Sequence, residues 1–178
     1  DGNLIKRIAT EQKAIIGLDW HPSKDIIVAV GDRITLYDLS SDSLRHIEDR
    51  AHEVLMLCVE WHPSGVLFVT GDYGDFQQNY PPLLQFWSAN GVKIKTVVKS
   101  KAEYRDLTWS KDGTLLATAS EKLRLWDKNG DLVLEKPVRN LLWGVDWNSD
   151  DSKLVTTDGK CLIHIWDRNL KNIDTLKY

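Results

Sequence analysis

The sequence predicts an all-β protein in which one four-stranded unit is repeated four times. The chain of 178 residues carries eight tryptophans, and seven of them fall into two series with a spacing of about 40 residues. Most of these tryptophans close a run of strand length, and turn-forming residues separate the runs. No stretch shows the pattern of a long helix. The repeat therefore defines the fold class.

The first series closes the first predicted strand of each unit. Its tryptophans lie 41, 48 and 38 residues apart, and turns such as His-Pro-Ser-Gly follow them. A second strand comes after each turn. The tryptophans are Trp20, Trp61, Trp109 and Trp147, and the predicted second strands are residues 26–30, 66–70, 115–120 and 153–157.

The second series closes the third strand, with intervals of 50, 39 and 40 residues. Asn90-Gly91 and Asn129-Gly130 follow two of its members, and Asn-Gly favours the positive φ angles of tight hairpins. A fourth strand is therefore expected after each turn. The members of the series are Tyr37, Trp87, Trp126 and Trp166.

The repeats divide the chain into units. Residues 1–8 match the segments that begin at Asn90 and Asn129, so residues 1–10 are predicted as an outer strand of a preceding blade. The four units that follow are blade 1 (11–49), blade 2 (50–99, with a loop insertion at 71–82), blade 3 (100–138) and blade 4 (139–178).

This pattern resembles the WD-repeat β-propellers, whose blades have four strands and repeat every 40–45 residues. Trp126-Asp127 and Trp166-Asp167 match the naming dipeptide, and His52 fits the structural histidine of the family. Glu11, Ser100 and Val138 hold the other histidine positions, so the resemblance implies an incomplete His–Ser–Asp–Trp network in every blade.

The resemblance also implies a ring of six to eight blades, most often seven, whereas four full blades are visible. Three interpretations remain open: the chain is part of a larger seven- or eight-bladed ring, it pairs with a second copy into eight blades, or it closes alone as four. An open array would expose apolar blade faces and unpaired strand edges. Self-association or further blades are therefore expected.

Partners of such propellers usually bind the face that carries the loops between strands four and one and between strands two and three. On that face, the insertion at 71–82 stands out, because it lengthens the second repeat by about nine residues. Aromatic residues and arginine dominate binding hot spots. The candidate partner-binding residues are Tyr73, Asp75, Phe76, Tyr80, Tyr104, Arg105 and Trp143.

Two alternatives compete with this interpretation of the insertion. The loop could plug the channel or cap a neighbouring blade, with its aromatic rings buried. Arg105 could also form a salt bridge with Asp75 or Glu103 and serve no partner.

A second candidate is an acidic row. Asp19, Glu60 and Asp146 each precede a first-strand tryptophan, and Thr108 takes the fourth position. Such a ring could bind a hard cation such as calcium, which gives the alternative of a metal-dependent hydrolase-type propeller. The competing interpretation is that turn amides or solvent satisfy these acids, and we expect no metal and no cofactor.

The chemistry of the remaining residues favours binding over catalysis. No histidine lies beside a plausible nucleophile, and no phosphate loop is visible, so no enzymatic activity is expected. A formal net charge of −3 argues against nucleic acid as a ligand. No apolar run is long enough to cross a membrane and no secretory leader is visible, so an intracellular, cytoplasmic location is expected.

The sequence thus predicts a non-catalytic scaffold that binds a protein or peptide. A purely structural segment of a larger protein is the remaining alternative.

Overall fold

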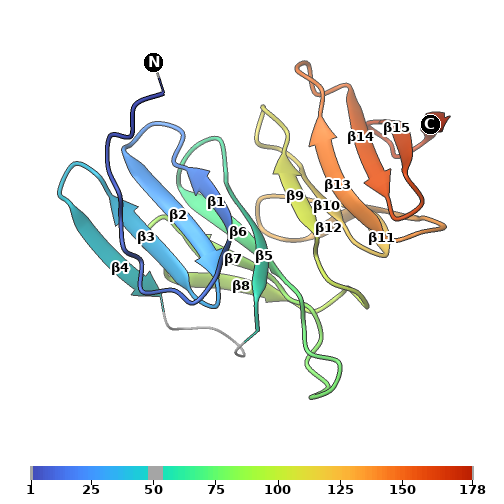
Figure 1. Ribbon diagram of the computed structural model, residues 1–178. Coiled ribbons are helices and arrows are strands. Elements are labelled where there is room, and N and C mark those ends of the chain that lie inside the picture. The colour runs from blue at the N-terminus through green and yellow to red at the C-terminus, as the bar shows by residue number, and fades with distance from the viewer. Residues whose placement is uncertain (1, 48–53, 178) are drawn as a thin grey trace.

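The computed structural model describes residues 2–47 and 54–177, and in these residues all regular structure is β. The strands form four antiparallel sheets of four, which confirms the predicted all-β fold of propeller blades (Figure 1). Blade 1 consists of β1 (Ile15–Trp20), β2 (Ile26–Gly31), β3 (Ile34–Asp38) and β4 (Ser43–Ile47), and blade 2 of β5 (Met56–Trp61), β6 (Leu67–Asp72), β7 (Leu84–Ser88) and β8 (Lys93–Val97). Blade 3 consists of β9 (Asp106–Trp109), β10 (Leu116–Ala119), β11 (Lys122–Trp126) and β12 (Leu132–Pro137). Blade 4 consists of β13 (Leu142–Trp147), β14 (Lys153–Asp158), β15 (Leu162–Asp167) and β16 (Asn172–Lys177).

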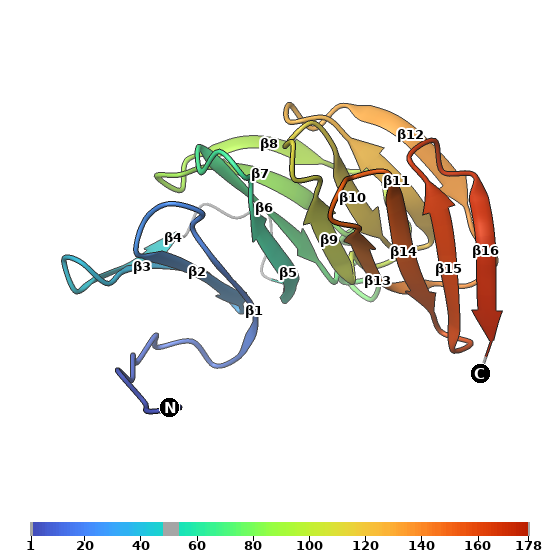
Figure 2. The same cartoon turned by 90° about the horizontal axis from the view of Figure 1, so that it is seen from above.

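Each blade is a simple meander, and the blades fan out from their first strands. β1, β5, β9 and β13 lie next to one another along the inner side of the fan. Figure 2 shows that the fan stays open between blade 1 and blade 4. The interpretation in which these four blades close a ring alone is therefore wrong for this structure.

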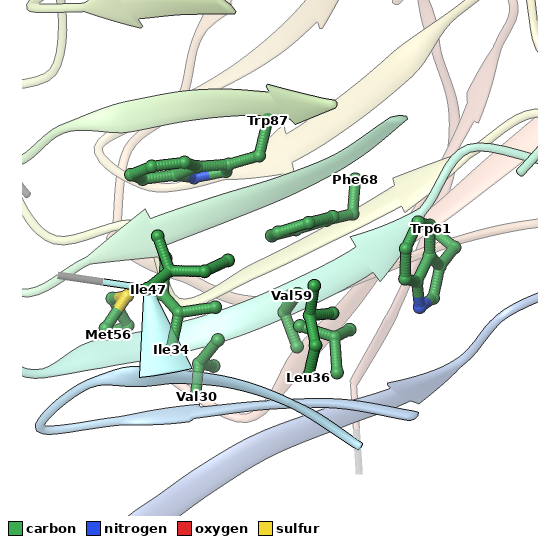
Figure 3. Packing of buried hydrophobic residues seen from close by; sticks show 10 residues of the cluster. Val30, Ile34, Leu36, Ile47, Met56, Val59, Trp61, Phe68 and Trp87 are labelled. Carbon is green, nitrogen blue, oxygen red and sulfur yellow. The ribbon is translucent and has the colours of Figure 1, made fainter. Parts of the chain in front are cut away.

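Neighbouring blades pack through two different faces. One face of each blade carries the first-strand tryptophan and the third-strand aromatic residue, and we call it the tryptophan face. The opposite, aliphatic face consists mainly of second- and third-strand side chains. Between blades 1 and 2, Val30 and Leu36 of the aliphatic face share one buried cluster with Trp61 and Trp87 of the tryptophan face (Figure 3). The next two interfaces repeat this arrangement.

The third-strand tryptophans are fixed by a hydrogen bond inside their own blade. The indole N–H of Trp126 donates to Thr118 Oγ1 at 2.9 Å, and blades 2 and 4 repeat this contact. Blade 1 has neither partner, because Ala29 stands at the threonine position and Tyr37 at the tryptophan position. Tyr37 instead donates its hydroxyl to Asp42.

The turn histidines join successive blades, a role that the repeat pattern did not predict. His62 Nε2 lies 2.9 Å from the carbonyl oxygen of Gly113 in the next blade, and its ring packs edge-on against Trp109. Ser64 donates its backbone N–H to His62 Nδ1, which leaves the proton on Nε2 in the neutral ring. His21 makes the same contact with Gly65.

Blades 3 and 4 use a different pair at this position. Ser110 replaces the histidine and Asp151 replaces the glycine. The Asp151 carboxylate accepts the backbone N–H groups of Lys111 and Asp112 at 2.9 and 3.0 Å. The carboxylate thus links the two turns that histidine and glycine link elsewhere.

The turns between third and fourth strands depart from the expected geometry. Gly91 and Gly130 adopt positive φ angles of 71° and 72°, while the preceding asparagines do not. Each turn is longer than a two-residue hairpin, and the Asp127 carboxylate accepts the amides of Asn129 and Asp131. Asp167 does the same in blade 4, which gives the second residue of each Trp-Asp dipeptide a turn-capping role.

Residues 2–10 form no strand, contrary to the prediction of an outer strand. Each sheet already has four strands, so none remains to pair with this segment. Its position nevertheless follows the repeat. Lys6 binds Asp42 at 2.5 Å, as Lys95 of β8 binds Asp131 of blade 3 at 2.6 Å. The segment therefore lies against blade 1 as an outer strand of a preceding blade would lie.

Candidate interaction surface

A row of β-bulges shapes the inner strands where they leave the loop-bearing face. The register of β1, β5 and β13 shifts one residue after the strand begins, so that one residue in each strand has no partner. Bulges re-aim side chains, and they are common near functional sites. Counting four residues back from each first-strand tryptophan gives the equivalent positions, which are Ile16, Leu57, Arg105 and Trp143.

Two members of this row, Arg105 and Trp143, form a stacked pair on neighbouring blades. The Arg105 guanidinium lies 4.2 Å from the centre of the Trp143 ring. Arg105 Nε also donates to Glu103 Oε1 at 2.9 Å, so the predicted salt bridge with Glu103 is present. The guanidinium is therefore held between a carboxylate and the indole. Trp143 remains 53% exposed, and the ion pair does not withdraw the aromatic ring from solvent.

The predicted insertion forms an ordered loop between β6 and β7, residues 73–83, that extends past the neighbouring strand ends (Figure 1). Asp75 and Tyr80 exchange two backbone hydrogen bonds of 2.8 and 2.7 Å. At the base, Asp72 Oδ1 accepts the amides of Gly74 and Leu83. The loop is thus braced at its base and at its middle.

The aromatic side chains of this loop face solvent. Tyr73, Phe76 and Tyr80 are exposed by 47%, 57% and 40%. The interpretation in which these rings are buried as a plug therefore does not hold. Asp75, by contrast, has an internal role, because its carboxylate accepts amide hydrogens from Gln77 and Gln78.

Tyr104 is a correction to the predicted surface. It is fully buried, and its burial raises its pKa. Its position, five residues before the tryptophan, is the inter-blade position that Met56 and Leu142 fill in the neighbouring blades. The Cβ of Tyr104 lies against Gly71. Tyr104 is therefore part of the core between blades 2 and 3 and is not available to a partner.

The residues that were predicted to have a structural role lie either between two blades or within one blade. Trp61, Trp109 and Trp147 are buried between blades, whereas Trp20 is exposed because no blade covers it. His52 falls outside the described residues. The family network of the resemblance is replaced in blade 3, where Ser100 Oγ contacts Ser120 Oγ at 2.7 Å and also donates to Glu121.

A buried ion network lies under the loops of blade 3. Arg124 on β11 is 1% exposed, and it donates to Glu121 and, at 3.2 Å, to Glu135. Lys122 adds a second cation to Glu135. Hydrogen bonds from Arg124 and two serines overcome the effect of burial and hold the pKa of Glu121 at about 2. The ion pairs thus tie Glu121, between β10 and β11, and Glu135 of the outer strand β12 to Arg124 of β11.

The acidic row connects the blades. Asp19 Oδ2 accepts the backbone amide of Trp61 at 2.6 Å, and Glu60 Oε2 accepts that of Trp109 at 2.9 Å. In blade 3, where Thr108 takes the position, Asp106 instead accepts the amide of Val145. The hypothesis of amide-capped acids thus fits these carboxylates. Within residues 2–47 and 54–177, no group of three or more metal-ligating side chains comes together.

Burial raises the pKa of Glu60 to about 9, and the neighbouring Asp19, Asp106 and Asp146 carboxylates add to the shift. The folded protein therefore keeps a proton on Glu60 that the unfolded chain loses near its ordinary pKa of 4.5. Stability from this group is full below pH 4.5 and falls as the pH rises toward 9.

We expect Glu60→Gln to match the wild type near pH 4.5 and to be more stable at pH 8. Glutamine keeps an acceptor oxygen for the Trp109 amide, and unlike Glu60 it does not have to take up a proton when the protein folds at pH 8. One pKa unit corresponds to about 1.4 kcal/mol, so a gain above about 1 kcal/mol is expected in urea denaturation. A loss of stability that is equal at both pH values would contradict this account.

The sequence pattern alone did not predict that Arg105 and Trp143 lie against each other, although one signal was available. Arg105 and Trp143 stand at the same offset from their tryptophans, as do Ile16 and Leu57. Within residues 2–47 and 54–177, no helix is long and apolar enough to cross a membrane.

A comparison with protein families supplies the remaining evidence. The family model for eukaryotic translation initiation factor eIF2A matches residues 1–145, which include blades 1 to 3 and the start of blade 4. The match therefore takes in most of the chain, the loop at 73–83, Arg105 and Trp143. With its propeller blades and this match, the chain belongs to the family of the eukaryotic translation initiation factor eIF2A.

Proposed function

We propose that the chain is a non-catalytic, intracellular scaffold of the WD-repeat type that binds a protein of the translation-initiation machinery. The binding surface consists of the loop at 73–83 and the Arg105–Trp143 pair. The family match supports a role in translation, and the Trp-Asp dipeptides with their turn-capping aspartates support the WD type.

The observation that carries the proposal is the exposure of large aromatic rings on a braced loop. Tyr73, Phe76 and Tyr80 remain in solvent, although burial of such rings is favourable. The Asp75–Tyr80 bridge and the Asp72 cap order the loop before any partner arrives. A preordered loop loses little conformational entropy on binding, so more of the contact energy appears as affinity.

The triple variant Tyr73→Ala, Phe76→Ala, Tyr80→Ala is expected to lose partner binding by at least about 30-fold, because hot-spot aromatics contribute 2 kcal/mol or more. The measurement is quantitative recovery of bound proteins from a translation-competent extract by the tagged chain. Circular dichroism should show an unchanged fold, since the rings are outside the core.

The matched control shortens three exposed apolar side chains in or next to the outer strands β8 and β12: Val92→Ala, Ile94→Ala, Val133→Ala. It should recover the same proteins as the wild type. Equal recovery by the loop variant and the control would overturn the proposed surface.

A further inference from the structure

The sequence contains two Asn-Gly dipeptides, and both lie in turns between the third and fourth strands of a blade. They are Asn90-Gly91 in blade 2 and Asn129-Gly130 in blade 3. In such a dipeptide the backbone nitrogen of glycine can attack the side-chain amide of asparagine, because glycine has no Cβ to obstruct the approach. Each dipeptide is therefore a candidate site for loss of the side-chain amide.

The two turns share one backbone geometry. Each glycine donates its backbone N–H to the residue three positions earlier, Gly91 to the Ser88 oxygen at 2.7 Å and Gly130 to the Asp127 oxygen at 3.0 Å. This hydrogen bond occupies the nitrogen that would attack the asparagine, so the turn has to open before the reaction begins. Local opening is easier where fewer contacts hold a segment closed. The contacts of each turn therefore decide how fast its asparagine reacts.

The turn in blade 3 is held closed by two carboxylates. Asp127 Oδ1 accepts the backbone N–H groups of Asn129 and Asp131 at 2.8 and 2.9 Å, and Asp127 Oδ2 accepts the side-chain amide of Asn129 at 3.3 Å. Asp131 also binds Lys95 of blade 2 at 2.6 Å, and Gly130 is buried. Both the attacking nitrogen and the amide that it would attack are thus restrained.

The turn in blade 2 has weaker contacts. Ser88 stands where blade 3 has Asp127, and its hydroxyl accepts the backbone N–H of Val92 at 3.1 Å. Val92 itself stands where blade 3 has Asp131, so this position offers no carboxylate to a neighbouring blade. The Asn90 side chain is exposed, and it forms no hydrogen bond with any residue that the structure describes. This turn therefore opens more easily than its counterpart.

A cation lies beside the turn in blade 2. A Cβ placed on Gly91 would lie 3.4 Å from Arg45 Nη2 of blade 1, so the guanidinium is close to the glycine. Attack on the amide develops negative charge, which a neighbouring cation stabilises. The turn in blade 3 instead places the Asp127 carboxylate against its asparagine. The charges near the two turns thus favour reaction at the same asparagine as the hydrogen bonds do.

We propose that Asn90 is a site of deamidation and that the fold protects Asn129 from the same reaction. The Gly91 nitrogen forms a bond to Asn90 Cγ, and the side-chain nitrogen leaves as ammonia with the proton that Gly91 gives up. Water then opens the resulting cyclic imide at either of its carbonyl groups, which produces aspartate or isoaspartate. The product carries one new negative charge near Arg45.

The test is incubation of the intact chain at pH 8 and physiological temperature, with the deamidated fraction at each asparagine measured by peptide mapping and mass spectrometry. Asn90 should react about tenfold faster than Asn129, because hydrogen bonds to a charged group stabilise a closed turn by about that factor. In concentrated urea the two asparagines should react at similar rates, since glycine follows both and neither turn is formed.

The matched variants exchange the residue that follows the third-strand tryptophan in the two blades. Ser88→Asp gives blade 2 the carboxylate of blade 3 and should slow deamidation of Asn90 by about tenfold. Asp127→Ser should accelerate deamidation of Asn129 by a similar factor, and circular dichroism should show that both variants are folded. Equal rates at the two asparagines of the folded wild type would overturn the proposal. So would an unchanged rate at Asn90 in Ser88→Asp.

Discussion

Gly113→Asp is expected to lower the free energy of unfolding by about 3–5 kcal/mol. Gly113 has a φ of 69°, and a Cβ placed there would lie 2.8 Å from two atoms of the His62 ring. An aspartate therefore introduces backbone strain and also displaces His62 from the Gly113 carbonyl oxygen. The measurement is urea denaturation monitored by tryptophan fluorescence.

The chain provides its own control for this substitution. Blade 4 has Asp151 at the glycine position with a φ of 58°, and blade 3 has Ser110 at the histidine position. The double variant His62→Ser, Gly113→Asp copies that pair between blades 2 and 3. It should recover about half of the lost stability. A double variant that is less stable than Gly113→Asp would contradict the inter-blade role of the histidine.

Arg124→Ala is expected to lower the free energy of unfolding by about 3–5 kcal/mol at pH 7, because it leaves two carboxylates without their buried cation. Arg124 is 1% exposed, and Glu121 has 25% of its side chain exposed. Arg33→Ala is the control, since 37% of the Arg33 side chain is exposed and it lies 3.8 Å from Asp32. Its cost should stay below about 1 kcal/mol.

The cost of Arg124→Ala should also depend on pH. The pKa of Glu121 is lowered from 4.5 to about 2 in the folded protein. The stability from this group is therefore full above pH 4.5 and is lost as the pH falls toward 2. The difference between wild type and Arg124→Ala should shrink between pH 7 and pH 3. A difference in the free energy of unfolding that does not change with pH would indicate that the loss comes from packing of the aliphatic part of the Arg124 side chain.

The repeat was sufficient to predict the strands, since each tryptophan marks a fixed place in a four-stranded unit. It was also sufficient to find the long loop, because the extra residues in blade 2 stand out by length alone. Contacts between neighbouring units were harder to predict from the sequence. His62 and Gly113 are 51 residues apart, and only the packed blades show that the turn histidine reaches the next glycine.

The error at Tyr104 has a similar origin. Tyr104 and Arg105 are adjacent in sequence, and both were expected at the rim. Both precede β9, and their side chains take different directions: Tyr104 lies in the core between blades 2 and 3, and Arg105 lies against the Trp143 ring. An offset of one residue decides which side chain is buried, and local composition does not reveal it. Residues 2–10 likewise form no strand because no neighbouring strand pairs with them, and the local sequence does not show whether such a partner strand is present.

The most direct test of the proposed surface is photo-crosslinking from single positions in a translation-competent extract. A photoreactive phenylalanine analogue would replace Phe76, Trp143 or, as a control, Val133 on the outer strand β12. All three side chains are exposed by about half. The account predicts that positions 76 and 143 crosslink to the same protein and that position 133 does not. Crosslinks of equal yield from position 133, or none from 76 and 143, would contradict it.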